Sequence, residues 1–333
     1  MTRNANNALI RRQLLSSLAN MPFCSGQYLA ELLNLSRTAV WKHIRALQDA
    51  GVDIHAVRGK GYRLNSCFEL LEEAKIRALV AKQQADLVSN IELFSYLPST
   101  NDYLLKQTSI PAKSVVLAEE QTAGRGRRGR SWLAPAGSIT LSLSWRFQRA
   151  QSSMPGLALA AAIAVIRAIK RQPAINTDHI KVKWPNDVVF KQQKLAGILV
   201  EMRGDALGPV DVVLGVGVNV DMPAHWQKKI DQPVASLSAV TNQAIERNRF
   251  AAALIVELAR CCQTFEDAGF KAFHKVWNEY DPYLSRQVSL KIGETIETGV
   301  SEGVDDCGAL LLRQGQVLRA FHSGEIEQSR FEQ

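Results

Sequence analysis

The sequence predicts an α+β protein of three domains, and three observations support this prediction. Short helices followed by a hairpin open the chain, strands and helices alternate from about Glu69, and short strands separated by glycine turns begin at about Leu284. A chain of 333 residues is also too long for one compact core. We therefore expect a winged-helix domain over 1–67, a central mixed-sheet domain over 68–282 and a small β domain over 283–333.

The first domain has the spacing of a helix-turn-helix. Ser25 and Ser36 are typical helix N-caps, and Gly51 is a typical helix stop. A basic turn between two short strands then predicts a wing. The expected elements are helices over Asn7–Leu18, Ser25–Leu33 and Arg37–Ala50, and strands over Ile54–Val57 and Tyr62–Leu64.

The positive charge is concentrated in this first domain. Residues 1–67 hold nine Lys/Arg against three Asp/Glu, a net +6, so only +2 of the total +8 remains for the rest of the chain. Polar and cationic side chains cover the third helix around its buried stripe, as in a helix that enters the major groove. The alternatives are a solvated basic surface or a purely structural helical trio. The candidate DNA-binding residues are Ser36, Arg37, Thr38, Trp41, Lys42, Arg45, Arg58 and Lys60.

The second domain alternates between strands and helices. Its clearest strand is Ser138–Trp145, where apolar residues alternate with hydroxyl-bearing ones, so one face is apolar and the other hydroxylated. The other expected strands are Ile91–Tyr96, Ser114–Gln121, Ile180–Trp184, Leu195–Met202 and Val210–Val220, and the expected helices are Asn101–Lys106, Met154–Lys170 and Phe250–Ala268. The strands expected in the third domain are Val288–Ile292, Glu294–Val300, Ala309–Leu312 and Gln316–Arg319.

Two segments of the second domain carry candidate chemistry. The loop Gly124–Arg130, GRGRRGR, combines glycines that permit close approach with arginines that bind carboxylate and phosphate. On its own it indicates only an anion nearby. At successive strand ends, Asp187, Lys194 and Gly197 suit a magnesium–triphosphate site that faces an acid substrate, although Pro-Asn-Asp is also an ordinary turn.

Several classes of function are disfavoured. The sequence contains no G-x-x-x-x-G-K-[ST], H-E-x-x-H or G-x-S-x-G motif, which argues against a P-loop, zinc chemistry and a covalent serine nucleophile. Five scattered cysteines (Cys24, Cys67, Cys261, Cys262 and Cys307) predict reduced thiols in a cytoplasmic protein. We expect neither a secretory signal nor a membrane span.

The strings GRGRRGRSW, KWPNDV and KLAGILVE, in this order and spacing, resemble the biotin–protein ligase family. SRTAVWKHI and RGKGY resemble the DNA-binding domain of the class that also represses biotin synthesis genes, so the resemblance covers nearly the whole chain. It implies a biotin/lipoate-ligase-like central domain and a C-terminal SH3-like β-barrel. The family's aromatic–glycine string stands here as Phe321-His322-Ser323-Gly324, without a tryptophan.

The resemblance implies an ATP-dependent, AMP-forming ligase. Biotin, ATP and Mg²⁺ would give biotinoyl-5′-AMP, whose biotin passes to a lysine of a biotin carboxyl carrier protein. Since the substrate carboxylate is itself the nucleophile, catalysis rests on positioning and charge neutralisation. An adenylate-bound homodimer would bind operator DNA.

The resemblance also assigns roles to individual residues. The biotin-binding residues would be Ser99, Thr100, Asn101, Gln121, Arg125, Gly126, Arg127 and Lys194. The nucleotide-binding residues would be Arg127, Arg128, Arg130, Trp132, Asn186, Asp187 and Asn219. The catalytic residues would be Lys194, Arg127 and Asp187, with Asp187 also near Mg²⁺. A lipoate ligase, a non-catalytic biotin-sensing repressor and a DNA-scaffolding protein are the alternative interpretations.

Overall fold

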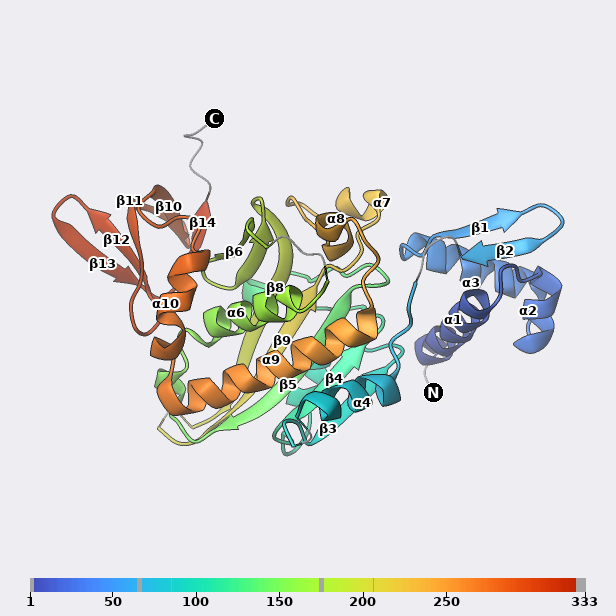
Figure 1. The fold of residues 1–333 in the computed structure, drawn as a ribbon, viewed down its shortest axis with the longest axis horizontal. Coiled ribbons are helices and arrows are strands. Elements are labelled where there is room, and N and C mark those ends of the chain that lie inside the picture. Colours follow the sequence, from blue (N-terminus) through green and yellow to red (C-terminus); the bar gives the residue numbers. More distant parts are fainter. Residues whose placement is uncertain (1–2, 65–67, 85, 174–176, 206, 328–333) are drawn as a thin grey trace.

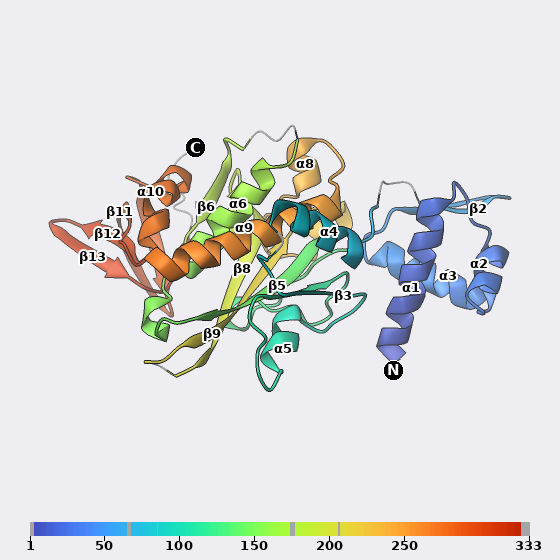
Figure 2. The same ribbon diagram turned by 60° about the horizontal axis from the view of Figure 1, so that its bottom comes forward.

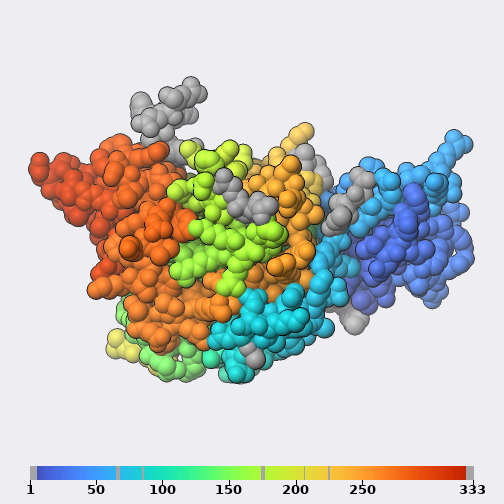
Figure 3. Space-filling model, viewed as in Figure 1, coloured from blue at the N-terminus to red at the C-terminus, as the bar shows by residue number. Residues whose placement is uncertain are grey.

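A computed structural model describes residues 3–64, 68–84, 86–173, 177–205 and 207–327. The winged helix is a separate lobe at one end of the molecule, the large sheet and its helices form the middle, and a small β domain lies at the other end (Figure 1). The space-filling view shows the N-terminal lobe projecting from the body (Figure 3). The α+β architecture is confirmed, while Cys67 lies outside the described residues.

The N-terminal lobe is a helix-turn-helix followed by a two-stranded wing. Ser25 and Ser36 accept the backbone N–H groups of Tyr28 and Ala39, so both act as the predicted N-caps. The wing is fastened to the helices because Cys24 and Tyr62 exchange backbone hydrogen bonds of 2.9 and 2.8 Å. The elements are α1 (Arg3–Asn20), α2 (Gly26–Leu32), α3 (Arg37–Asp49), β1 (Ile54–Val57) and β2 (Gly61–Leu64).

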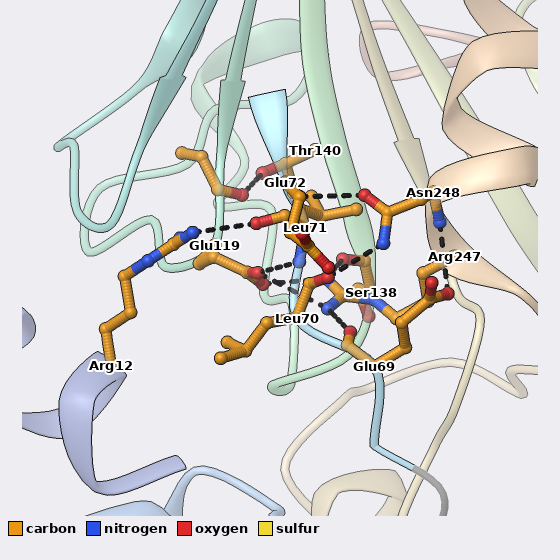
Figure 4. A network of polar contacts seen from close by, with 11 residues as sticks. Arg12, Glu69, Leu70, Leu71, Glu72, Glu119, Ser138, Thr140, Arg247 and Asn248 are labelled. Atoms are coloured by element: carbon orange, nitrogen blue, oxygen red, sulfur yellow. Dashed lines mark hydrogen bonds and ion pairs between the residues drawn. The ribbon is translucent and has the colours of Figure 1, made fainter. Parts of the chain in front are cut away.

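The segment that follows the lobe is fixed to the central domain by side chains (Figure 4). Arg247, which is almost fully buried, donates to the carbonyl of Glu69 at 2.6 Å and to the carboxylate of Glu119 at 2.8 Å. The same carboxylate accepts the backbone N–H of Leu71 at 2.6 Å, while Arg12 of α1 donates to the Leu71 carbonyl at 2.9 Å. The lobe is therefore attached through a network of hydrogen bonds and not by the chain alone.

The central domain contains a seven-stranded mixed sheet in the order β3-β4-β5-β9-β8-β7-β6, in which β3 and β4 are parallel and the other pairs antiparallel. Six of the strands were predicted, and the short β7 was not. The strands are β3 (Asn90–Phe94), β4 (Ser114–Ala118), β5 (Ile139–Phe147), β6 (Ile180–Lys183), β7 (Asp187–Phe190), β8 (Gln193–Gly204) and β9 (Val210–Val218).

Helices cover the two faces of this sheet unequally. The apolar face packs against α6 and α9, and α4 lies on α9, whereas the short α5 lies on the opposite face (Figure 2). The hydroxylated face of β5 is consequently buried as well, under α5. The helices are α4 (Glu73–Gln83), α5 (Thr100–Leu105), α6 (Leu157–Lys170), α7 (Ala224–Gln227), α8 (Leu237–Thr241), α9 (Arg247–Ala268) and α10 (Lys271–Tyr280). None of the helices in the described ranges has the length and apolar character needed to cross a membrane.

The C-terminal domain is a five-stranded antiparallel sheet in the order β13-β12-β11-β10-β14, with a bulge in β11 between Ser301 and Val304. This agrees with the predicted small β domain. It shares one hydrophobic core with the central domain, and Trp184 donates its indole N–H to the carbonyl of Gly308 at 3.0 Å. The strands are β10 (Gln287–Ile292), β11 (Thr295–Val304), β12 (Leu310–Gln314), β13 (Val317–Phe321) and β14 (Glu325–Glu327).

Candidate active site

The floor of the site follows from the register of the three central strands. Gly197, Gly217 and Thr140 are paired across β8, β9 and β5, and the next row on the same face is Leu199, Gly215 and Ser142. A Cβ on Gly217 would clash with the Trp132 indole, and one on Gly215 would clash with the Asn101 amide. The glycines therefore make a notch that admits these side chains, and this explains the glycines of the GVGV strand.

One end of the notch is a buried hydrogen-bonding cluster at the start of α5. Ser99 caps the helix, which places Thr100 and Asn101 in its first turn, all three nearly inaccessible to solvent. Gln121 Oε1 accepts the Thr100 backbone N–H at 2.7 Å. Ser142 on β5 is within 2.7 Å of Thr100 Oγ1 and donates to Asn101 Oδ1 at 2.5 Å. Such a cluster suits a small polar ring.

The arginine loop closes over the notch as a hairpin. Gly126 N donates to the Arg130 carbonyl at 2.7 Å, and Trp132 N donates to the Gly124 carbonyl at 2.8 Å. At its tip, Arg128 and Gly129 both have positive φ. The hairpin thus keeps its arginines above the sheet, in position for an anionic ligand.

The other end of the notch carries Lys194 and Asp187, whose side chains form an ion pair of 3.0 Å. A bulge lies in β8, because Val188 pairs with Ala196 whereas Val189 pairs with Lys194. In a strand without a bulge, Lys194 would lie on the opposite face from Gly197, three residues away, so the bulge turns its ammonium group into the site.

Two polar atoms of this site have no partner among the described residues. They are Asp187 Oδ1 and the indole nitrogen of Trp132, both fully buried. An unpaired buried carboxylate oxygen beside cationic groups fits a hydrated cation or a ligand donor. Arg127 lies close by and donates to Asn186 Oδ1 at 3.2 Å, while burial lowers the pKa of its guanidinium.

The C-terminal domain also reaches the site. Arg130 donates to both carboxylate oxygens of Glu325, at 3.0 and 2.5 Å. This hydrogen-bonded pair holds the pKa of Glu325 below its usual value, and Lys183 and Arg128 contribute through their charges. The segment that lacks the expected tryptophan therefore still places Gly324 and Glu325 at the cavity wall.

One cavity contains nearly all the predicted ligand residues. Its lining includes Ser99, Thr100, Asn101, Gln121, Arg125, Gly126, Arg127, Arg128, Arg130, Trp132, Asn186, Asp187 and Lys194. Asn219 is not among the described residues that line this cavity. It is buried, and its side chain donates to the Lys194 carbonyl at 3.1 Å. The motifs assign no role to Glu201 or Glu325, whose partners lie far away in the chain.

The predicted DNA-binding residues all lie on the surface of the N-terminal lobe. Arg37, Thr38, Trp41, Lys42 and Arg45 are exposed on α3, and Arg58 and Lys60 are exposed at the wing. Ser36 is exposed too, with its hydroxyl used as the N-cap of α3. A helix and a hairpin that both present cations suit the groove and backbone of DNA.

The far end of α3 contacts two loops of the central domain. Ala136 N donates to the Ala50 carbonyl at 2.8 Å, and the Trp226 indole donates to the Asp49 carbonyl at 3.1 Å. The first loop continues from Trp132. The second continues to Pro233, whose carbonyl accepts the backbone N–H of Lys194 at 2.9 Å. Both loops therefore join the DNA-binding helix to walls of the cavity.

Comparison with known proteins agrees with this architecture. The sequence models of the biotin/lipoate A/B protein ligase family, a helix-turn-helix domain and the biotin protein ligase C-terminal domain match residues 93–219, 10–63 and 283–327, respectively. The bifunctional ligase/repressor BirA of Escherichia coli (strain K12) is 36% identical over 94% of this chain and 95% of its own. That of Bacillus subtilis (strain 168) is 31% identical over 96% and 98%.

A solved structure of a biotin protein ligase is also similar to this chain. The biotin protein ligase from Aquifex aeolicus in complex with biotin and ATP superposes with a TM-score of 0.61, at 25% identity, over 72% of this chain and 98% of that one. Because the two BirA relatives are 31–36% identical to this chain and match along nearly their whole length, this chain belongs to the bifunctional biotin ligase/repressor family.

Proposed function

We propose that this protein activates biotin with ATP and transfers it to a lysine of a biotin carboxyl carrier protein. The observation that carries the proposal is the shape of the notch. A neutral hydrogen-bonding cluster lies at one end, Lys194 at the other, and three arginines project from the hairpin above. This arrangement fits an acid with a small polar ring at its far end, together with a polyphosphate.

The residues act by positioning and by charge neutralisation. The buried cluster around Asn101 holds the ureido ring of biotin, and Lys194 receives the carboxylate. Arg127, Arg128 and Arg130 neutralise the phosphates while the carboxylate attacks the α-phosphorus and pyrophosphate leaves. An acceptor lysine then attacks the mixed anhydride, takes the biotinoyl group and releases AMP.

The free carboxylate oxygen of Asp187 is the group suited to Mg²⁺. Among the described residues there is no group of three or more His, Cys, Asp or Glu side chains arranged to hold a metal. A magnesium ion at Asp187 would therefore take its remaining ligands from phosphate oxygens and water, which is its usual coordination in nucleotide sites. When bound, it supplies charge neutralisation at the phosphates.

ATP–pyrophosphate exchange by the purified full-length protein tests this activity, with biotin, lipoate or neither added. Biotin-dependent exchange is expected. Exchange with lipoate alone would indicate a lipoate ligase. Biotin binding without exchange, in a folded protein, would indicate a sensor that retains the pocket but lacks the chemistry.

We further propose that the adenylate-bound form is a cytoplasmic homodimer that represses biotin synthesis genes. Support comes from the exposed cations of α3 and the wing, and from the family relation. Two winged helices related by a two-fold axis would contact an inverted repeat. Footprinting on the operator should show occupancy only with biotin and ATP, and equal occupancy without them would contradict the proposal.

A further inference from the structure

Glu201 is the last residue of the KLAGILVE motif and has no role in the mechanism above. It lies on β8 and pairs with Val213, on the same sheet face as Gly197 and Leu199. It is not among the described residues that line the cavity, and its side chain is 24% exposed. Any contribution to ligand binding must therefore pass through other residues.

The carboxylate of Glu201 receives two donors that do line the cavity. Asn101 Nδ2 donates to Oε2 at 2.8 Å, and Arg125 Nη2 lies 2.8 Å from both oxygens. Asn101 is at the start of α5, and Arg125 is at the start of the arginine hairpin. One side chain thus connects the ring end of the notch with the loop above it.

These contacts determine the orientation of the Asn101 amide. An ionised carboxylate only accepts hydrogen bonds, so the NH₂ group of Asn101 must face Glu201. Its Oδ1 then faces Ser142, which donates at 2.5 Å. The amide has its carbonyl and one N–H satisfied, and its second N–H remains to donate to a ligand carbonyl.

Arg125 is fixed in the same way. Besides Glu201, it forms an ion pair of 2.5 Å with Asp102 on α5. Its backbone forms an isolated antiparallel bridge with Ser131, which closes the hairpin. Because Glu201 and Asp102 hold Arg125, they also hold the start of the arginine hairpin against α5.

We infer that Glu201 is a positioning residue for recognition of the ligand ring, acting through Asn101 and Arg125. The inference rests on the proposed function, in which this end of the notch receives the ureido group of biotin. Glu201 keeps the second N–H of Asn101 directed at the ureido carbonyl. If this orientation is lost, the pocket discriminates less well against acids that have no ureido carbonyl.

The first test is biotin binding by calorimetry with the full-length protein, without ATP. Glu201→Ala should weaken biotin binding about tenfold, since a charge-assisted hydrogen bond that orders a buried amide is lost. Glu201→Gln keeps one acceptor oxygen for Asn101 and should recover part of the loss. In exchange assays, the KM for biotin should rise in Glu201→Ala while kcat and the KM for ATP change little. The preference for biotin over lipoate should also fall.

Arg203→Gln is the matched control. Arg203 lies two residues further along β8, on the same face, and donates to the carbonyls of Leu105 and Gln107 at the other end of α5. Its replacement loosens the same helix but leaves Asn101 in place. If Arg203→Gln weakens biotin binding as much as Glu201→Ala, Glu201 has only a general structural role and the inference is wrong.

A double-mutant cycle that combines Glu201→Ala with Asn101→Ala tests whether Glu201 acts through Asn101. The two substitutions should be less than additive in the free energy of biotin binding, because they remove the same interaction. Full additivity would overturn the inference. Because binding is measured separately from exchange, a wild-type protein that binds biotin but lacks exchange would contradict the proposed ligase activity and still allow this test of Glu201. A wild-type protein that does not bind biotin would overturn both.

Discussion

At the residue scale, the site depends on side chains that occupy space left by glycines. Gly217 has no Cβ, and the indole of Trp132 takes that space above β9. Trp132 in turn lies beside Lys194, whose ammonium group is 5.6 Å from the ring centroid. A change at the floor of the notch therefore moves a wall residue and the lysine expected to hold the substrate carboxylate.

Gly217→Ala should displace the indole, because the added methyl group would overlap it. We expect biotin binding to weaken by tenfold or more, corresponding to about 1.4 kcal/mol, with the fold retained. Gly208→Ala is the control, since among the described residues its Cβ would meet only the Asp205 side chain, at 3.7 Å. Calorimetry on both variants checks the prediction, and unchanged binding in Gly217→Ala would show that Trp132 is free to move.

Arg127→Gly should release the adenylate. Arg127 bridges from the hairpin to Asn186, and its loss removes both a cation and this 3.2 Å contact over the cavity. Biotin-dependent pyrophosphate exchange should persist while biotinoyl-5′-AMP escapes into solution. Filtration of the reaction mixture followed by chromatography measures the free adenylate, and retention equal to wild type would refute the assigned role.

The sequence identified the residues of the cavity better than it identified their partners. The family resemblance placed Ser99, Asn101 and Lys194 in one site, and all three line the cavity. Glu201 is 100 positions from Asn101, and Glu325 is 195 positions from Arg130, so no local pattern links them. Sheet register and domain docking bring these pairs together, and both are properties of the folded chain.

At the scale of elements, most of the strands and helices were predicted because their hydrophobic periodicity is clear. The strand β7 was missed because it turns into β8 through Lys191 and Gln192, both with positive φ. Such turns usually contain Gly or Asn, so the sequence gives no turn signal here. The helix α4 was missed for a similar reason, since Glu72 precedes it and makes no side-chain cap.

The junction between α10 and β10 contains a carboxyl group that is costly to ionise. Burial raises the pKa of Asp281 to about 6, although Tyr283 N donates to its Oδ1 at 2.8 Å. Its other oxygen is buried and has no partner among the described side chains and backbone. Because the folded state binds this proton more tightly than the unfolded state, Asp281 favours folding below about pH 4 and loses that contribution as pH rises through 6.

Asp281→Asn should therefore stabilise the protein at neutral pH. The amide keeps an acceptor for the Tyr283 N–H and removes the buried charge. Removing this charge should raise the free energy of unfolding by up to about 3 kcal/mol at pH 8. Urea unfolding at pH 4 and pH 8 measures the difference, and the gain should be largest at pH 8. A stability gain independent of pH would show that the charge of Asp281 is not its cause.

At the scale of the whole molecule, the DNA-binding lobe is held at two places. Arg12 and the segment after residue 68 join the network around Arg247, and the end of α3 contacts the loops that lead from Trp132 and to Lys194. The first attachment explains how the lobe keeps its place beside the sheet (Figure 4). The second brings the recognition helix into contact with segments that continue to the walls of the cavity.

Trp226→Phe tests the second attachment. It keeps an aromatic ring but removes the donor to the Asp49 carbonyl, a bond worth about 1 kcal/mol. The stimulation of operator binding by biotin and ATP should fall several-fold, while pyrophosphate exchange stays near the wild-type rate. Gln227→Ala, on the same short helix, should leave both unchanged. Fluorescence anisotropy with operator DNA measures the first quantity, and an unaltered stimulation in Trp226→Phe would exclude this contact from the response.

The docking of α3 on these loops has a consequence for the enzyme itself. Binding free energies that are linked are reciprocal, so if the adenylate raises the affinity for operator by some factor, operator must raise the affinity for the adenylate by the same factor. A protein bound to its operator would then bind the adenylate more tightly than a free protein does. Repression of biotin synthesis genes and biotinylation of the carboxylase would then both depend on the adenylate-bound protein. Operator DNA and the acceptor protein would compete for it.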